Sequence, residues 1–154
     1  KEEKESLWEA FSGVFALLLV LMLIIVVITI YYNVLRYSYK RDFEKKDYNG
    51  KIYMLFIRIL RHLKKEGFVM SPDETVLMLA DRVKEHFRFE GVSFLEVAEI
   101  YMRYRYAEEA VTQEDYKMVA AFRTGLANKY RSENSKLTVW LEELIFLSRR
   151  KSLQ

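Results

Sequence analysis

The chain has no cysteine, only two histidines and a single proline. Without thiols it can form neither a disulfide framework nor a thiolate metal site. The histidines, His62 and His86, fall on separate predicted helices without metal-ligand spacing, and half-buried or solvated positions account for both. No glycine-rich loop follows a strand, and no nucleophile has a base and an orienting group in the pattern. We therefore expect no enzyme activity, catalytic residue, metal or cofactor in this chain.

Charge is missing from one long stretch near the start of the chain. No charged residue occurs between Ala10 and Leu35, and Val14 to Ile28 is apolar without interruption. A helix of about 22 residues rises about 33 Å, which is enough to cross a hydrocarbon core of about 30 Å. The β-branched residues would suit a strand, but a lone strand in lipid leaves its backbone unpaired. The pattern predicts a transmembrane helix over residues 11–32, because the run is too long and its start too acidic for a signal peptide.

Basic residues are divided unequally between the two flanks of this segment. Only Lys1 and Lys4 precede it. It is followed by Arg36, Lys40, Arg41, Lys45, Lys46 and Lys51. Because positive charge is retained on the cytoplasmic side, we expect the N-terminus outside and the rest of the chain in the cytoplasm. The predicted membrane-interface residues are Trp8, Tyr31, Tyr32, Arg36, Lys40 and Arg41. A start at Lys suggests that the missing part of a longer protein lies outside the cell.

The residues after the apolar segment are basic overall. From Asn33 onward there are 23 Lys and Arg against 18 Asp and Glu, and ten of the basic residues fall between Arg36 and Lys65. Anionic lipid attracts such juxtamembrane charge. Nucleic-acid binding is the less favoured explanation, because the position beside a membrane already accounts for the charge.

Helical spacing of apolar residues predicts an all-α protein, with one transmembrane helix followed by a cytoplasmic bundle of about five helices. Residues 1–10 form an extracytoplasmic flank, and residues 33–50 form a basic juxtamembrane linker or an extension of the first helix. A helical cytoplasmic domain covers residues 51–133, and a C-terminal amphipathic helix covers residues 134–154. No stretch alternates well enough to predict a pair of strands.

Turn and capping residues predict where the helices begin and end. Asn49-Gly50 is the first expected break, and Gly67 ends the helix that follows it. Capping-box spacing occurs at Ser71 with Glu74, where Pro72 would be the first helical residue. The same start signal recurs at Ser93 with Glu96 and at Thr112 with Asp115. Gly125 falls inside a predicted helix, which only a close contact with another element would justify.

The segment Tyr101–Tyr106 interleaves tyrosine with arginine. We expect packing here, with Arg105 paired to a carboxylate and Glu99 paired to Arg103 on the surface; phosphate or partner recognition is the alternative. The last helix either belongs to the core, burying Leu137, Trp140, Leu141, Leu144 and Ile145, or docks on a membrane or partner. The candidate interaction residues are Tyr101, Arg103, Tyr104, Arg105 and Trp140.

The order of these features resembles a family. A transmembrane helix and a basic linker precede Gly67-Phe68 and the segment Ser71-Pro72-Asp73-Glu74-Thr75, which are followed by Tyr101, Arg105-Tyr106 and Val111-Thr112-Gln113-Glu114-Asp115. Over residues 14–131 this resembles the C-terminal cytoplasmic domain of bacterial membrane-bound transglutaminase-like proteins. Its most specific parts are Pro-x-x-Thr, Arg-Tyr and Thr-x-x-Asp. The last helix lies outside the resemblance.

The resemblance implies a location in the bacterial inner membrane, with the family's Cys-His-Asp chemistry in an extracytoplasmic domain upstream. It also implies a protein partner in the cytoplasm, because such proteins are often encoded beside a MoxR-type AAA+ ATPase and a companion with a von Willebrand A-like domain. We expect a non-enzymatic, membrane-anchored interaction or regulatory tail. The alternative is a helical module of a small single-pass protein that binds anionic lipid at the membrane surface.

Overall fold

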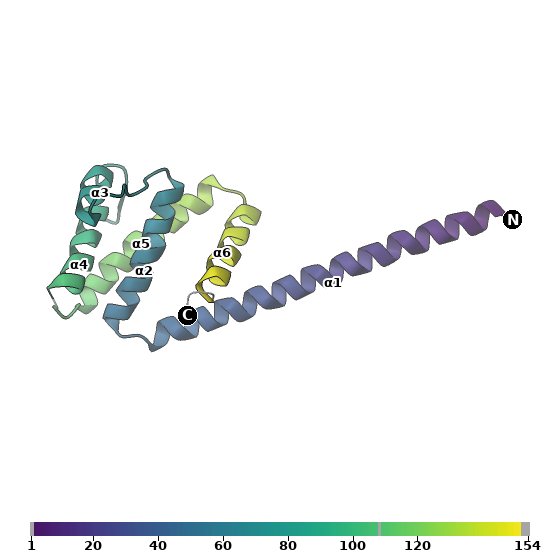
Figure 1. Ribbon diagram of the computed structural model, residues 1–154, viewed down its shortest axis with the longest axis horizontal. Coiled ribbons are helices and arrows are strands. Elements are labelled where there is room, and N and C mark those ends of the chain that lie inside the picture. The colour runs from purple at the N-terminus through teal and green to yellow at the C-terminus, as the bar shows by residue number, and fades with distance from the viewer. Residues whose placement is uncertain (1, 108, 152–154) are drawn as a thin grey trace. The chain divides into compact units, whose positions relative to one another are not determined.

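The chain folds almost entirely into helices (Figure 1). The computed structural model describes the backbone of residues 2–107 and 109–151, and the side chains of residues 12–107 and 109–149. The described residues contain six helices and one very short hairpin, so the all-α expectation is confirmed. They form two compact units, residues 1–40 with 143–154, and residues 41–142. Each unit is described separately.

The first helix, α1, runs from Glu2 to Lys45. It contains the whole apolar segment and continues through the basic residues after it, so residues 33–45 extend the helix. The break expected at Asn49-Gly50 is wrong. The chain turns at Lys46 and Asp47, and α2 (Tyr48–Lys65) begins there because the Asp47 carboxylate accepts a hydrogen bond from the Gly50 N–H at 2.9 Å. Gly67 ends this helix with φ +89°, as expected.

The next helix begins later than the sequence pattern predicts. Helix α3 covers Val76–Val83, with Thr75 rather than Ser71 as its N-cap. Ser71 and Glu74 instead close a turn, in which the Glu74 carboxylate accepts from the Ser71 N–H at 3.0 Å. Arg82 donates to the same carboxylate at 2.8 and 3.0 Å and so holds Glu74 outside the helix. The capping-box spacing was therefore real, but the two residues use only half of it.

A two-stranded hairpin follows α3, where the sequence pattern predicted no strands. Strand β1 (Arg88–Phe89) pairs with β2 (Val92–Ser93) in antiparallel register. The two turn residues, Glu90 and Gly91, have φ of +52° and +83°. Positive φ at both positions is the conformation of a type I′ turn, which matches the twist of paired strands. Strands of two residues are too short for alternation to reveal them.

The last two helices of the core begin where they were predicted. Helix α4 (Phe94–Tyr106) starts at a Ser93–Glu96 capping box, and α5 (Gln113–Glu133) starts at a Thr112–Asp115 capping box. Gly125, inside α5, lies against the hairpin, since a Cβ there would approach the Phe89 ring to 2.3 Å. The close contact expected at this glycine is confirmed, although its partner is a strand.

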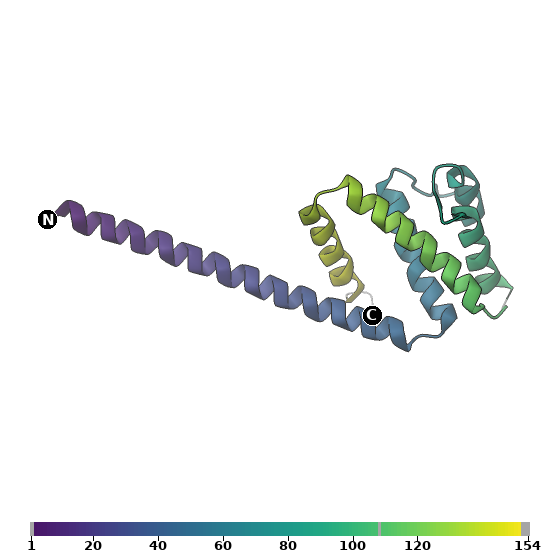
Figure 2. The same ribbon diagram turned by 180° about the vertical axis from the view of Figure 1, so that it is seen from behind.

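The core of residues 41–142 is built on aromatic rings. Helix α2 packs against α5 and α4, and α3 packs against α4 (Figures 1 and 2). Phe56, Phe94 and Phe122 are almost completely buried, one from each of α2, α4 and α5. Neighbouring rings lie 5.9–6.0 Å apart, in the range of favourable aromatic pairs. These three helices form a stable support for side chains on their outer faces.

The final helix, α6, covers Lys136–Lys151 and contributes to both units. In residues 41–142, its Glu142 carboxylate accepts hydrogen bonds from Lys65 and Tyr130. In the other unit, Glu143 accepts from the Tyr32 hydroxyl at 3.0 Å, and Phe146 lies edge-on to Tyr39 at 5.9 Å. The second half of α6 therefore packs on the α1 segment that directly follows the apolar run.

Candidate functional site

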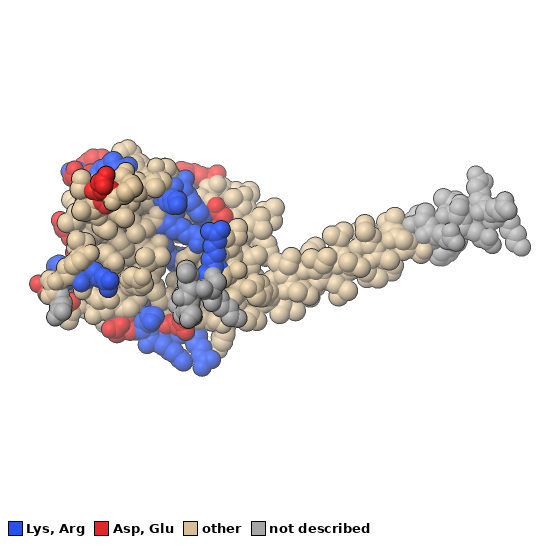
Figure 3. Space-filling model, viewed as in Figure 1, with Lys and Arg blue, Asp and Glu red and all other residues tan. Residues whose placement is uncertain are grey.

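The apolar segment of α1 is uncovered along its length. Its large side chains from Val14 to Ile30 are 38–64% exposed, and no part of its most apolar stretch is buried. Figure 3 shows this stretch without a basic or acidic side chain. The structure therefore contains one N-terminal helix that is long and apolar enough to cross a membrane. An exposed apolar surface of this length marks a membrane or protein contact.

The predicted membrane-interface residues do not all face outward. Tyr31, Arg36, Lys40 and Arg41 are exposed, whereas Trp8 lies outside the residues whose side chains are described. Tyr32 is only 7% exposed and donates its hydroxyl hydrogen to Glu143. It therefore fixes α6 to α1 and cannot face lipid, which corrects the prediction for this residue. A partner so far away in the sequence could not be recognised from hydropathy.

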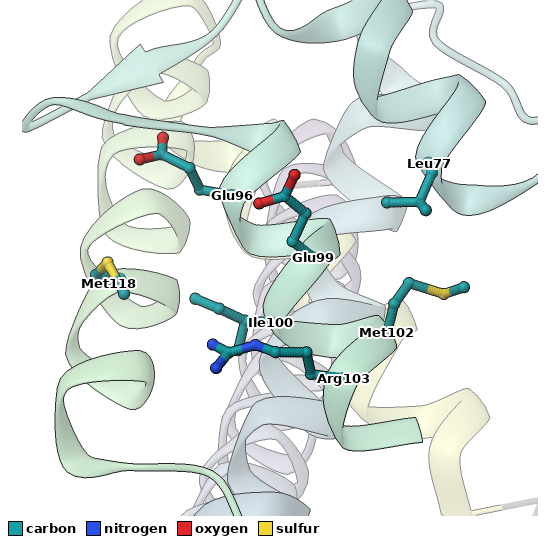
Figure 4. Close-up of a pocket in the computed structure, with 7 residues that line it drawn as sticks. All are labelled: Leu77, Glu96, Glu99, Ile100, Met102, Arg103 and Met118. Carbon is teal, nitrogen blue, oxygen red and sulfur yellow. The ribbon is translucent and has the colours of Figure 1, made fainter. Parts of the chain in front are cut away.

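A pocket of about 480 Å³ lies on residues 41–142, with α4 as its floor (Figure 4). Leu77 of α3 borders one side and Met118 of α5 the other. The floor is formed by Glu96, Glu99, Ile100, Met102 and Arg103. We call these seven residues the α4 groove. Methionine suits such a surface, because its flexible, polarizable side chain adapts to different partners.

Arg103 connects the groove to the start of α5. Its guanidinium donates to the Asp115 carboxylate at 2.7 Å, while the Thr112 N–H and hydroxyl donate to the same carboxylate at 3.0 and 2.8 Å. Burial raises the pKa of Asp115, but the hydrogen bonds from Thr112 and Arg103 outweigh it and hold that pKa below its usual value. The expected pairing of Arg103 with Glu99 is not formed among the described residues, because Arg103 turns to this buried carboxylate.

Replacing Asp115 tests which of these contacts stabilises the fold. Asp115→Ala removes an N-cap partner and should lower the free energy of unfolding by about 1–2 kcal/mol. Arg103→Gln should lower it by less than about 1 kcal/mol, since the Arg103 side chain is 51% exposed and solvent screens the pair. Urea unfolding of the full chain in detergent micelles measures both. Glu114→Ala in the same turn is the control, and an Arg103 effect larger than the Asp115 effect would contradict this ranking.

The Tyr101–Tyr106 segment divides into a packed part and an exposed part. Tyr101 stacks on Phe56 with ring centroids 3.9 Å apart, and Tyr104 lies edge-on to Tyr101 at 6.4 Å. Burial raises the pKa of Tyr101. Arg105 and Tyr106 are exposed, and Tyr106 is 73% accessible to solvent. Among the described residues Arg105 has no carboxylate partner; Arg103 has that role instead.

His62 is a half-buried structural side chain, as expected. Its Nδ1 lies 3.0 Å from the Arg58 carbonyl, and its ring is edge-on to Tyr130 at 5.5 Å. Burial, together with the nearby charges of Lys65 and Arg123, lowers the pKa of His62 to about 4. Burial and the Glu142 carboxylate raise the pKa of Tyr130 to about 12. His62 is therefore neutral at pH 7 and donates its Nδ1 hydrogen to the carbonyl.

The lowered pKa of His62 makes stability depend on pH. Between about pH 6.5 and 4 the unfolded chain binds a proton at His62 that the folded chain does not, so stability should fall as the pH falls through this window. The slope is at most about 1.4 kcal/mol per pH unit, and less because His62 is partly solvated. We expect His62→Asn to reduce the slope measured by urea unfolding from pH 7 to 5. An unchanged slope would contradict a neutral buried imidazole.

The last helix is only partly packed. Trp140 and Leu144 are half-buried and Leu147 is 5% exposed, but Leu137, Leu141 and Ile145 are 67, 43 and 45% exposed. The predicted burial of these three residues is wrong, because the side of α6 that carries Glu142 and Glu143 faces the protein. Sequence reasoning expected an apolar stripe to face inward and did not anticipate that two carboxylates would do so.

Among the described residues, no group of three or more histidine, aspartate or glutamate side chains could hold a metal ion. Sequence reasoning also missed Leu77 and Met118 as groove residues, since three helices must be placed before their proximity is visible. Comparison with known proteins found no matching family model, no matching curated protein and no matching solved structure. The α4 groove and the uncovered α1 segment are thus the two features that suggest a function.

Proposed function

We propose that this chain is a membrane-anchored, non-enzymatic interaction module. The apolar segment of α1 spans the membrane once, and residues 41–142 lie on the cytoplasmic side and recognise a protein partner. The observation that carries the proposal is the uncovered α1 segment, since burying that much apolar surface in lipid removes its contact with water. The basic residues from Arg36 to Lys51 support the orientation.

The α4 groove is the partner site that the side chains favour. It joins apolar walls at Leu77 and Met118 to two carboxylates, Glu96 and Glu99, at its floor. Hydrogen bonds from Ser93 lower the pKa of Glu96, so this carboxylate is ionised at neutral pH. Sites of this kind, concave and apolar with a few polar groups, are where proteins bind their ligands.

The groove can be tested with two neighbouring residues of α3. Leu77→Asp places a charge in the groove, whereas Met78→Asp places the same charge on the next residue, which is 57% exposed and does not line it. Aspartate is favoured in the first turn of a helix, so both variants should fold. With the full chain as bait in solubilised membranes, Leu77→Asp should reduce recovery of the wild-type partner at least about tenfold, a cost of about 1.4 kcal/mol. Met78→Asp should retain it, and equal recovery with both variants would contradict the site.

The particular system we propose is the cytoplasmic tail of a bacterial transglutaminase-like membrane protein, coupled to a MoxR-type ATPase. Its support is the resemblance alone, and the structure separates the motifs on which that rests. Thr75 and Thr112 are N-caps, which gives them a structural role. Arg105 and Tyr106 are exposed and are not explained by packing. A reading frame upstream without a Cys-His-Asp domain, or a pull-down that recovers neither the ATPase nor its companion, would count against this assignment.

A further inference from the structure

Helix α6 carries an apolar stripe that the protein does not cover. Leu137, Leu141 and Ile145 are spaced four residues apart, so they share one side of the helix. Arg149, four residues further, is exposed at the end of the same stripe, and Lys136 is exposed at its start. An apolar stripe with basic residues at its ends is typical of a helix that lies in a membrane interface.

The contacts of α6 with α1 give its depth. Tyr32, which binds Glu143, lies two residues beyond Ile30 in the same helix, and Tyr39, which contacts Phe146, lies nine residues beyond it. At 1.5 Å per residue these positions are about 3 and 13 Å past the end of the apolar run. The headgroup layer on each side of a bilayer is about 5–8 Å thick. If α1 spans the membrane, the Glu143–Phe146 turn therefore lies in this layer or just outside it.

The charges of α6 fit an anionic lipid surface. Its two carboxylates are engaged with the protein, Glu143 by Tyr32 and Glu142 by Lys65 and Tyr130. Burial raises the pKa of Glu142, but the hydrogen bonds from Lys65 and Tyr130 lower it further, so this carboxylate is ionised and paired. The acidic groups are thus turned toward partners within the chain, while Lys136 and Arg149 remain on the surface. Anionic headgroups attract such basic residues.

From these observations we infer that α6 is an interfacial helix, which inserts Leu137, Leu141 and Ile145 into the bilayer that α1 spans. The inference rests on the proposed membrane anchor and adds a second membrane contact, at which anionic phospholipid is the ligand. This contact holds the start of the cytoplasmic domain to the membrane surface, because α6 directly follows α5. It also gives a role to the last helix, which lies outside the family resemblance.

The absence of cysteine makes the inference directly testable by site-directed spin labelling. The full chain is reconstituted in nanodiscs of phosphatidylcholine with a minority of phosphatidylglycerol, with one nitroxide at Leu141→Cys or Ile145→Cys. Ile24→Cys is the lipid reference, and Lys117→Cys, on the exposed side of α5, is the water reference. Collision rates with oxygen and with a water-soluble nickel chelate report the environment of each label.

We expect the labels at Leu141 and Ile145 to collide with oxygen more than with nickel, with nickel collisions at least about fivefold below those at Lys117, as for apolar side chains at the acyl boundary. Water-like values at both positions, with a lipid-like Ile24, would overturn the inference and leave the anchor intact. Labels immobilised and shielded from both reagents would also overturn it, since they would indicate a protein covering α6. A water-like Ile24 would overturn the anchor itself.

Discussion

Replacing Leu21 and Ile25 together with arginine should release the chain from membranes. Both residues lie near the middle of the apolar segment and are 48 and 62% exposed, so nothing in the protein would shield the new charges. Each arginine at the centre of a membrane helix costs about 2.5–3.5 kcal/mol on insertion scales, so the pair costs about 5–7 kcal/mol. We expect nearly all of the double variant in the soluble or aggregated fraction after carbonate washing, and the wild-type chain in the membrane pellet.

The matched control adds the same charge beyond the apolar run. Tyr37→Arg with Ser38→Arg changes two exposed residues on the basic flank of α1. Positive charge is tolerated and favoured there, so this variant should remain in the pellet. If both double variants stay in the membrane fraction, α1 is held by something other than its apolar segment. If both leave it, net charge rather than the position of the charge determines membrane binding.

Gly125→Ala should destabilise the cytoplasmic domain, although alanine is the better helix former. The substitution gains about 1 kcal/mol in helix propensity. Against this, the new Cβ would lie 2.3–2.5 Å from three atoms of Phe89, so the hairpin must move away from α5. Overpacking of this kind costs about 1–3 kcal/mol, and displacing Phe89 from the Phe122 ring at 5.4 Å adds to the loss. We expect a net loss of about 2 kcal/mol, or roughly 10 °C in melting temperature.

A double-mutant cycle with Phe89 separates the clash from other effects. In a Phe89→Ala background the space beside Gly125 is open, so Gly125→Ala should be neutral or stabilising. Thr124→Ala, at the exposed neighbouring position, should change stability by less than about 0.5 kcal/mol. Thermal unfolding of the full chain in micelles, followed by near-ultraviolet circular dichroism, measures all four. Equal losses from Gly125→Ala in both backgrounds would contradict the close contact.

Local sequence signals predicted most helix starts and stops because their chemistry is local. The capping boxes at Ser93 and Thr112 and the stop at Gly67 depend on residues within a few positions of one another. The start at Ser71 failed because Arg82, eleven residues away, takes the Glu74 carboxylate. The sequence therefore showed where hydrogen bonds can form, and tertiary contacts selected which of them do.

The candidate sites were less predictable because they depend on distant partners. Tyr32 and Glu143 are 111 residues apart in sequence, and nothing in either segment indicates their hydrogen bond. The burial of Glu142 and Glu143 turned the apolar stripe of α6 outward, which reversed the prediction for Leu137, Leu141 and Ile145. Likewise, spacing along α4 suggested Glu99 as the partner of Arg103, but the buried cap at Asp115 attracts the guanidinium more strongly. Polar contacts between helices, rather than hydropathy, decide which faces remain available.

The central claim is that α1 crosses the membrane and places residues 41–142 in the cytoplasm. Its most direct test is the reaction of single cysteines with a membrane-impermeant maleimide in sealed vesicles of both orientations. We predict that Ser71→Cys, at an exposed turn, reacts only when the cytoplasmic face is outward, and that Ile24→Cys reacts in neither orientation. Reaction of Ser71→Cys from the external face, or rapid reaction of Ile24→Cys in intact vesicles, would contradict the account.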